Sequence, residues 1–155
     1  EADAAKLVPG TKIKVTGYTS EWSGEYEIID ATFEFVDGSS FVAESVDLTE
    51  ALTAGDEEML KAHQNEFFTV KGATIATAPI YKWDGSGQDG DDLYFDITVG
   101  DQTYNFTVES YLCGAGTDCS EAVKALQVGD TVDLEGFLYW YEGANPHITA
   151  VAPAK

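Results

Sequence analysis

The chain has 155 residues, a formal net charge of −20 and 44 % hydrophobic residues, with eight Phe, eight Tyr and three Trp. This apolar content can fill a core, so it excludes a wholly disordered chain. Nucleic-acid binding draws most of its affinity from Lys and Arg at phosphates, and only eight such residues are scattered along the chain. An anionic membrane surface would repel it in the same way. Sugars, other proteins and metal ions remain as partners, although the charge could also serve solubility alone.

No apolar run approaches the roughly 20 residues that cross a bilayer, so we expect no membrane insertion. The sequence starts at Glu1 in an Ala-rich stretch, without an initiator Met or a signal peptide. We therefore expect a segment of a longer polypeptide, with adjacent domains in the same chain.

The chain contains one internal match, in which residues 1–35 align without a gap on residues 120–154. The shared pattern, with φ an apolar residue, is L-x-x-G-x-x-φ-x-φ-x-G. It predicts a short helix that ends near a Leu, a Gly in the turn that follows, and a strand that bends at the second Gly. The identical pairs are Leu7/Leu126, Gly10/Gly129, Gly17/Gly136, Gly24/Gly143, Ile29/Ile148 and Ala31/Ala150.

Between the two copies, residues 37–65 are predicted to form a connector with short helices. Asp56 can cap a helix that places Met59, Leu60 and His63 on one side, and Thr49 lies in another helical stretch. His63 is interpreted as part of that packing face and not as a ligand.

Residues 66–155 are predicted to form five strands with one helix between the third and the fourth. Gly72 interrupts the first strand, as a bend between two sheets of a barrel requires, and Gly100–Asp101 forms the turn of a hairpin. The expected strands are Glu66–Trp83, Leu93–Val99, Gln102–Leu112, Thr131–Tyr141 and His147–Ala152, and the helix is Asp118–Gln127.

This order of elements resembles the oligonucleotide/oligosaccharide-binding (OB) fold, whose helix closes one end of a small five-stranded barrel. The resemblance implies a mainly β protein in three parts. Residues 1–36 would be the helix and hairpin of a first OB-like repeat, residues 37–65 the connector, and residues 66–155 a complete OB-like domain. A β-sandwich is the alternative fold, and the single helix at that position argues against it.

In an OB-like barrel, ligands lie across the second and third strands, between the first-second and fourth-fifth loops. Here those loops are Trp83–Asp92 and Trp140–Pro146. Flat aromatic rings suit the C–H face of a sugar, and carboxylates or amides can bind its hydroxyls; the same rings could instead cover the end of the barrel. The candidate ligand-binding residues are Trp83, Asp84, Asp91, Asp92, Trp140, Tyr141, Glu142 and Asn145.

An acidic loop and a pair of cysteines are further candidates for metal binding and for a disulfide. The loop Asp84–Asp92 (DGSGQDGDD) is rich in carboxylates, but it lacks the spacing of an EF-hand, so we interpret it as a solvated acidic loop; a Ca²⁺ site is the less favoured alternative, and no cofactor is expected. Cys113 and Cys119 can close a disulfide across a Gly-rich loop, and two reduced thiols are the alternative. The two His residues do not complete a zinc site or a catalytic arrangement with a Ser or Cys.

In composition and in the order of its elements, the chain is similar to OB-like accessory modules of bacterial surface and secreted proteins. Those modules are acidic, poor in Lys and rich in Tyr, Thr and Gly. This resemblance implies a non-catalytic extracellular or cell-surface module that binds carbohydrate. The alternative is a structural spacer or protein-interaction repeat with no small ligand, which predicts tight packing between the first hairpin and the barrel.

Overall fold

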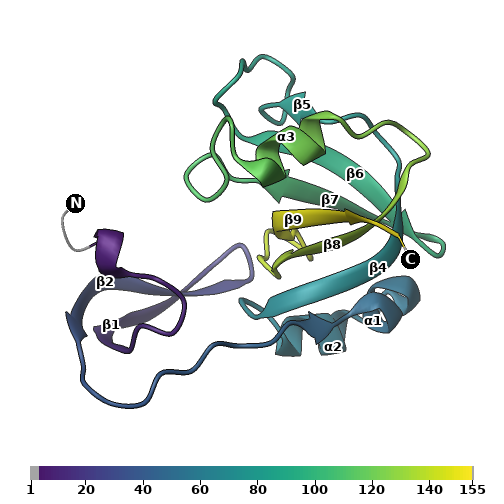
Figure 1. Ribbon diagram of the computed structural model, residues 1–155. Helices are drawn as coiled ribbons and strands as arrows, with labels where there is room; N and C mark the ends of the chain where they lie inside the picture. Colours follow the sequence, from purple (N-terminus) through teal and green to yellow (C-terminus); the bar gives the residue numbers. More distant parts are fainter. Residues whose placement is uncertain (1–3, 155) are drawn as a thin grey trace.

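The computed structural model describes residues 4–154, and its main body is a closed barrel of five strands (Figure 1). The barrel strands are β4 (Phe67–Ile75), β6 (Leu93–Val99), β7 (Gln102–Val108), β8 (Thr131–Phe137) and β9 (His147–Pro153). Around the barrel the hydrogen-bonded order is β4, β6, β7, β9, β8 and back to β4; only the β7–β9 pair is parallel. The helix α3 (Asp118–Lys124) connects β7 to β8. The predicted mainly β class and OB-like barrel are therefore confirmed.

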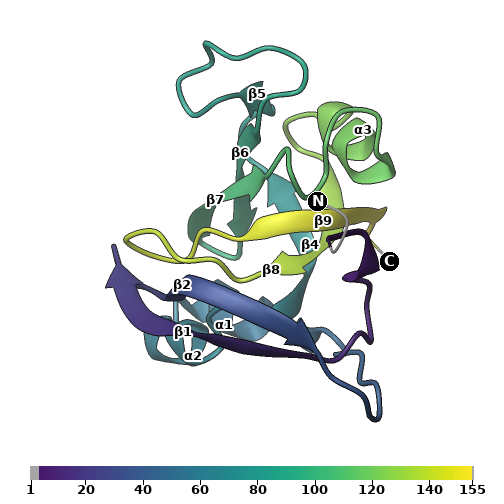
Figure 2. The same cartoon turned by 90° about the vertical axis from the view of Figure 1, so that its left-hand side faces the viewer.

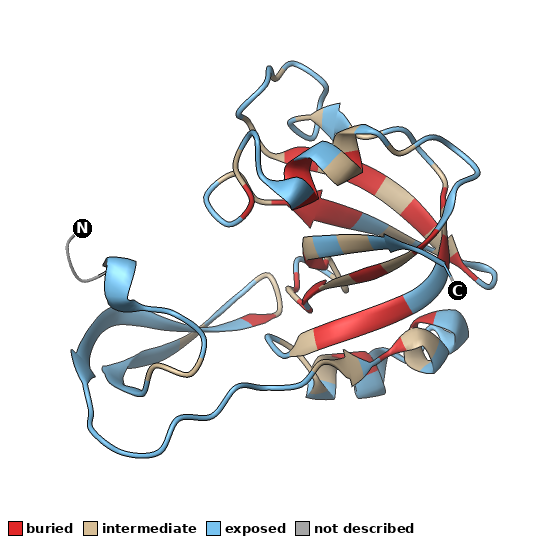
Figure 3. Ribbon diagram, in the orientation of Figure 1, coloured by how far each residue is buried: buried red, intermediate tan, exposed pale blue. Residues whose placement is uncertain are grey.

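The core of the barrel follows from strict alternation in β6, where Leu93, Phe95, Ile97 and Val99 are buried and the residues between them are partly exposed. Figure 3 shows buried residues along the barrel strands and mostly exposed residues along the hairpin. The Phe95 ring meets Phe106 of β7 edge to face, with centroids 6.1 Å apart.

Glycines produce the bends that a small barrel needs. Gly72, at φ +65°, lies in a bulge of β4, and its N–H donates to Asp133 Oδ1 at 2.9 Å. Gly136 of β8 lies opposite a bulge of β9, where a Cβ would stand 2.8 Å from the Ile148 Cα. Only a residue without a side chain permits this approach of the two strands.

The connector contains β3 (Val46–Asp47), α1 (Thr49–Ala54) and α2 (Glu57–Ala62), and both helices pass beneath β4 in Figure 1. As the sequence predicts, Asp56 caps α2: its Oδ1 accepts from the Met59 N–H at 3.0 Å. No helix among residues 4–154 combines the length and the apolar character that crossing a membrane requires.

Three barrel strands, β4, β7 and β8, are shorter than predicted. The first ends at Ile75, because Pro79 has no N–H for a ladder and the chain leaves the barrel; it then forms the two-residue strand β5 (Ile80–Tyr81). The strand β7 ends at Val108 and not at Leu112, because the chain then turns and the Cys113 N–H donates to the Glu109 carbonyl at 2.9 Å. The strand β8 ends at Phe137, because the Tyr139 N–H turns back to donate to the Phe137 carbonyl at 2.9 Å. The segments after β4 and β8 thereby become the loops that lead toward β6 and β9.

Residues 4–35 contain a 3₁₀ turn, η1 (Ala4–Lys6), and a separate hairpin of β1 (Ile13–Trp22) and β2 (Glu25–Phe35). Figure 2 views the molecule from the side of this hairpin. Among residues 4–154, the turn of the hairpin contacts the α2–β4 segment and the β8–β9 loop. We call this contact, between residues 22–26 and residues 61–65 and 140–142, the seam.

Besides a hydrogen bond from the Asn65 side chain to the Glu25 carboxyl, five hydrogen bonds hold the seam. The backbone of the turn bonds to two side chains at the start of β4 and to the loop after β8. The bonds are Tyr26 N to Gln64 Oε1 (2.6 Å), Gln64 Nε2 to Gly24 O (2.9 Å), Asn65 Nδ2 to Tyr26 O (2.9 Å), Trp140 N to Glu25 Oε2 (2.9 Å) and Glu142 N to Ser23 O (2.8 Å).

Glu25 is the most buried residue of the hairpin, at 3 % exposure. Burial raises the pKa of its carboxyl above the usual 4.5, while hydrogen bonds from the Asn65 side chain and the Trp140 N–H oppose that shift. The seam is therefore a specific, desolvated contact, whereas the rest of the hairpin projects into solvent (Figure 3).

Candidate functional site

A groove of about 890 Å³ runs across the outer faces of β6 and β7, between the β4–β6 loop and the β8–β9 loop. It follows from the alternation that builds the core: while Phe95 and Ile97 point inward, Tyr94 and Asp96 of the same strand point outward into the groove. On β7 the outward residues are Asn105 and Thr107, which pair with Asp96 and Tyr94 respectively.

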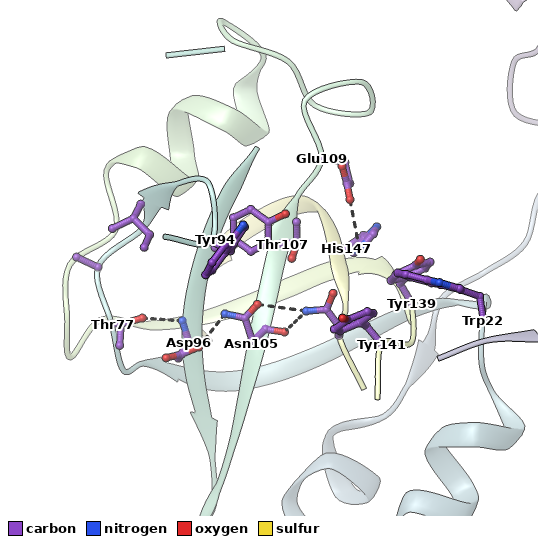
Figure 4. Close-up of a pocket in the computed structure, with 14 residues that line it drawn as sticks. Trp22, Thr77, Tyr94, Asp96, Asn105, Thr107, Glu109, Tyr139, Tyr141 and His147 are labelled. Carbon is purple, nitrogen blue, oxygen red and sulfur yellow. Dashed lines mark hydrogen bonds and ion pairs between the residues drawn. The ribbon is translucent and has the colours of Figure 1, made fainter. Parts of the chain in front are cut away.

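Five aromatic side chains line this groove: Trp22, Trp83, Tyr94, Tyr139 and Tyr141. Figure 4 shows Trp22, Tyr139 and Tyr141 gathered at one end. Trp22 comes from the hairpin, and its ring packs on Tyr141 with centroids 5.1 Å apart and planes tilted by 42°. Trp83 stands alone at the β4–β6 loop and is 77 % exposed, so nearly all of its ring surface is open.

A row of polar side chains crosses the groove from β6 to the β8–β9 loop. Asn105 Nδ2 donates to Asp96 Oδ1 at 2.9 Å, and Asn145 Nδ2 donates to the Asn105 carbonyl at 2.9 Å. Behind them, the Asp96 N–H donates to Thr77 Oγ1 at 2.8 Å (Figure 4). These bonds fix the amides and the carboxylate in place while leaving acceptor positions open to a bound molecule.

The floor of the groove is desolvated. The His147 ring stacks on Tyr139 with centroids 4.2 Å apart, and its Nε2 lies 3.6 Å from Glu109 Oε1, too far for a hydrogen bond. Burial lowers the pKa of His147 to about 4, against a smaller opposing effect of Asp92, so the imidazole is neutral at pH 7. Burial, and then the nearby Asp92, raise the pKa of Glu109.

Thr107 completes the floor. Its side chain is 1 % exposed, and among the described residues its Oγ1 is the buried side-chain polar atom that has no hydrogen-bond partner. A buried hydroxyl without a partner costs about 1–3 kcal/mol. A polar group that reached this part of the floor would therefore be stabilised there.

Three of the eight predicted ligand-binding residues line the groove: Trp83, Tyr141 and Asn145. Glu142 lies outside it, and its backbone N–H bonds to the seam. Trp140 was predicted to be exposed and is instead 3 % exposed, because Gly24 of the hairpin packs directly on its ring. It is therefore a packing residue of the seam and offers no face to a ligand.

The three predicted acids of the β4–β6 loop also lie outside the groove, and hydrogen bonds hold each of them elsewhere. Asp84 accepts from the Ser86 N–H and hydroxyl, at 3.0 and 2.7 Å. Asp91 accepts from the Gln88 N–H at 2.9 Å, and Asp92 from the Ser110 N–H at 2.7 Å. Asp84 and Asp91 thus serve local turns, whereas Asp92 joins the loop to the segment after β7.

The groove residues that the sequence analysis missed fall into two kinds. Tyr94, Asp96, Asn105 and Thr107 occupy the outward positions of the second and third barrel strands, so alternation applied to those strands would have found them. Trp22 could not be found in this way, because it reaches the groove from a separate hairpin.

Cys113 and Cys119 are free, buried thiols, which differs from the disulfide that their spacing predicts. Each sulfur instead faces a backbone carbonyl of β9: Cys113 Sγ lies 4.0 Å from Thr149 O, and Cys119 Sγ lies 3.7 Å from Ile148 O. Burial, followed by the neighbouring Cys113, raises the pKa of Cys119 to about 12. The pair therefore packs the helix α3 against the barrel.

Comparisons of the chain with protein-family models, with curated proteins and with solved structures gave no match.

Proposed function

We propose that this chain is a non-catalytic carbohydrate-binding module of a larger extracellular or cell-surface protein, and that the sugar lies in the groove across β6 and β7. The observation that carries the proposal is the pairing of open aromatic rings with a fixed row of amide and carboxylate groups. Pyranose rings present an apolar C–H face and a rim of hydroxyls, and the groove offers a matching surface for each.

The aromatic rings and the row of polar groups are suitably placed for a ligand longer than one sugar. Trp83 lies at one end of the groove, and the pair Trp22 and Tyr141 lies at the other, with Asp96 and Asn105 between them. A chain of several sugar units could therefore stack at both ends while its hydroxyls bond to the centre. The OB-like position of the groove agrees with this use, since that face binds oligosaccharides in other barrels of this type.

Charge favours a neutral ligand over a nucleic acid. Asp96 and Glu109 line the groove, and the chain carries a formal charge of −20. Aromatic rings can also stack nucleic-acid bases, but the phosphates would meet carboxylates in place of Lys and Arg.

The test is titration of the chain with a panel of soluble neutral oligosaccharides, followed by tryptophan fluorescence and by calorimetry. We expect one or more members to change the emission, and Trp83→Ala to weaken the binding at least about tenfold, the scale of one lost stacking contact. Tyr18→Ala is the matched control, because Tyr18 is 71 % exposed on the hairpin and lies outside the groove. Absence of binding across the panel, or equal loss in both variants, would overturn the proposal.

A structural spacer or protein-interaction repeat is the second candidate, and the seam favours it. The turn of the hairpin packs specifically on the barrel and buries Trp140 and Glu25, as a fixed junction between repeats requires. If this is the only function, no sugar will bind, while variants of the seam will still release the hairpin.

A further inference from the structure

The hairpin β1–β2 has one apolar face that residues 4–154 leave partly exposed. Ile13 and Val15 of β1 lie opposite Phe35 and Phe33 of β2, and these four side chains are 37 to 45 % exposed. The opposite face is polar, with Lys14 Nζ and Glu34 Oε1 in an ion pair at 3.0 Å. We call the side chains Ile13, Val15, Phe33 and Phe35 the open face. A two-stranded hairpin is only marginally stable by itself, and an apolar patch of this kind marks an interface.

Both outer edges of the hairpin are also unpaired, since β1 and β2 form a sheet of two strands among the described residues. Exposed edges offer rows of free N–H and C=O groups to another strand.

The pair β8–β9 of the barrel repeats the design of this hairpin. In each pair the second strand has one extra residue at the same place, in β2 opposite Thr16 to Tyr18 and in β9 opposite Glu135 and Gly136. Gly17 and Gly136 stand opposite these bulges for the same reason: a Cβ on Gly17 would lie 2.8 Å from the Ile29 carbonyl of the facing strand, and one on Gly136 would also meet its facing strand.

The cross-strand register refines the sequence match by one residue in the second strand. Val15 lies opposite Phe33, and its counterpart Leu134 lies opposite Val151. The open face therefore corresponds to Val132, Leu134, Val151 and Pro153, and the identities that the ungapped alignment gives in β2 are one residue out of structural register.

The barrel shows what covers the corresponding face of β8–β9. There β4 pairs antiparallel with the free edge of β8, and β7 pairs parallel with the free edge of β9. As a result Leu134 is 0 % exposed and Val132 is 6 % exposed, whereas Val15 and Ile13 are 45 % and 37 % exposed. The pair β8–β9 thus has neighbouring strands on both edges, whereas the matching pair β1–β2 has none among the described residues.

We propose that the open face binds a three-stranded antiparallel β-meander of the kind that β4, β6 and β7 form, which closes the hairpin into a second OB-like barrel. The first strand of the meander pairs antiparallel with β1, its third strand pairs parallel with β2, and its alternating apolar side chains cover the open face. This inference does not depend on sugar binding in the groove. The second barrel would lie beside the groove, because Trp22, the last residue of β1, lines the groove next to the seam.

The test uses a tandem chain in which a second copy of residues 66–119 precedes Glu1, at the junction that the internal match defines. Hydrogen exchange is measured for the amides of β1 and β2 in the tandem and in the 155-residue chain. We expect exchange in the hairpin to slow about tenfold or more in the tandem, because closure of the barrel suppresses local opening. The control tandem carries Phe95→Asp and Phe106→Asp in the added copy alone, which removes two fully buried rings of the meander. It should leave the hairpin as exposed as before.

A second measurement does not require the tandem to fold. In the 155-residue chain, Val15→Asp with Phe33→Asp should lower the fluorescence of the apolar dye ANS and leave the urea midpoint of the barrel unchanged. A fall in that midpoint would mean that the chain already covers the face. Equal exchange in tandem and single chain, or a concentration-dependent dimer of the 155-residue chain that protects its own hairpin, would also overturn the proposal.

Discussion

Replacing Gly24 with alanine should release the turn of the hairpin from the barrel. Gly24 has φ +89°, and a Cβ at this position would stand 2.8 Å from both Cδ1 and Nε1 of the Trp140 ring. The left-handed backbone costs an L-residue about 1–2 kcal/mol, and an overlap with a buried ring costs about 1–3 kcal/mol more. Each hydrogen bond of the seam contributes about 0.5–1.5 kcal/mol. The cost of the substitution is thus comparable to the free energy that the hydrogen bonds of the seam contribute.

Hydrogen exchange of a peptide spanning residues 18–30, measured by mass spectrometry, reports this release directly. We expect its exchange to accelerate in Gly24→Ala, while the peptides of β6 and β7 keep their protection because the barrel core stays intact. Acrylamide should also quench tryptophan emission more strongly, since Trp140 becomes accessible.

Gly129→Ala separates the cost of the left-handed backbone from the cost of the overlap with the Trp140 ring. Gly129 has almost the same backbone angle, φ +93°, but a Cβ there would meet no atom within 4 Å. This control should lose about 1–2 kcal/mol of barrel stability and leave the seam closed. If Gly24→Ala keeps the turn as protected as in the unmodified chain, the seam does not depend on the packing of Gly24 against Trp140, and the reasoning fails.

Three further outcomes follow from the barrel. Gly136→Ala should lower the free energy of unfolding by about 2–3 kcal/mol in urea titrations, because a Cβ would collide with the facing strand; an unchanged midpoint would contradict the account of that bulge. His147, with its pKa lowered from 6.5 to about 4, binds a proton more readily when unfolded, so stability should be full above pH 6.5 and fall as the pH drops toward 4. Its loss should be on the order of 2–3 kcal/mol, and His147→Asn should flatten this slope; the same slope in both proteins would rule out His147 as its source. Cys119, buried and with its pKa raised to about 12, should react with a thiol reagent at mildly alkaline pH at least about 100-fold more slowly in the folded chain than in urea. Equal rates would show that the thiol is accessible.

The elements of the barrel could be predicted because each one has a local signal. Alternation from Leu93 to Val99 specifies a strand with one buried face, and Gly100–Asp101 specifies the turn after it. Asp56 marks the start of a helix through a cap within its own first turn. Gly72 marks a bend in a strand. These signals depend on neighbours within a few residues, so the amino-acid order alone carries them.

The site could be predicted only in part. The OB-like order of elements points to the face and the loops where the groove lies, and Trp83, Tyr141 and Asn145 line that groove. Trp140 was misplaced because its burial depends on Gly24, which lies more than a hundred residues earlier in the chain.

Local sequence thus determined which segments become strands and which residues of each strand face the core. The tertiary structure alone decided that the hairpin turn docks beside the groove, brings Trp22 to Tyr141 and covers Trp140. The physical reason is that secondary structure arises from interactions between near neighbours, whereas exposure of a loop side chain depends on which distant surface packs against it. The residue pattern within the β8–β9 loop therefore does not predict its contact with the hairpin turn.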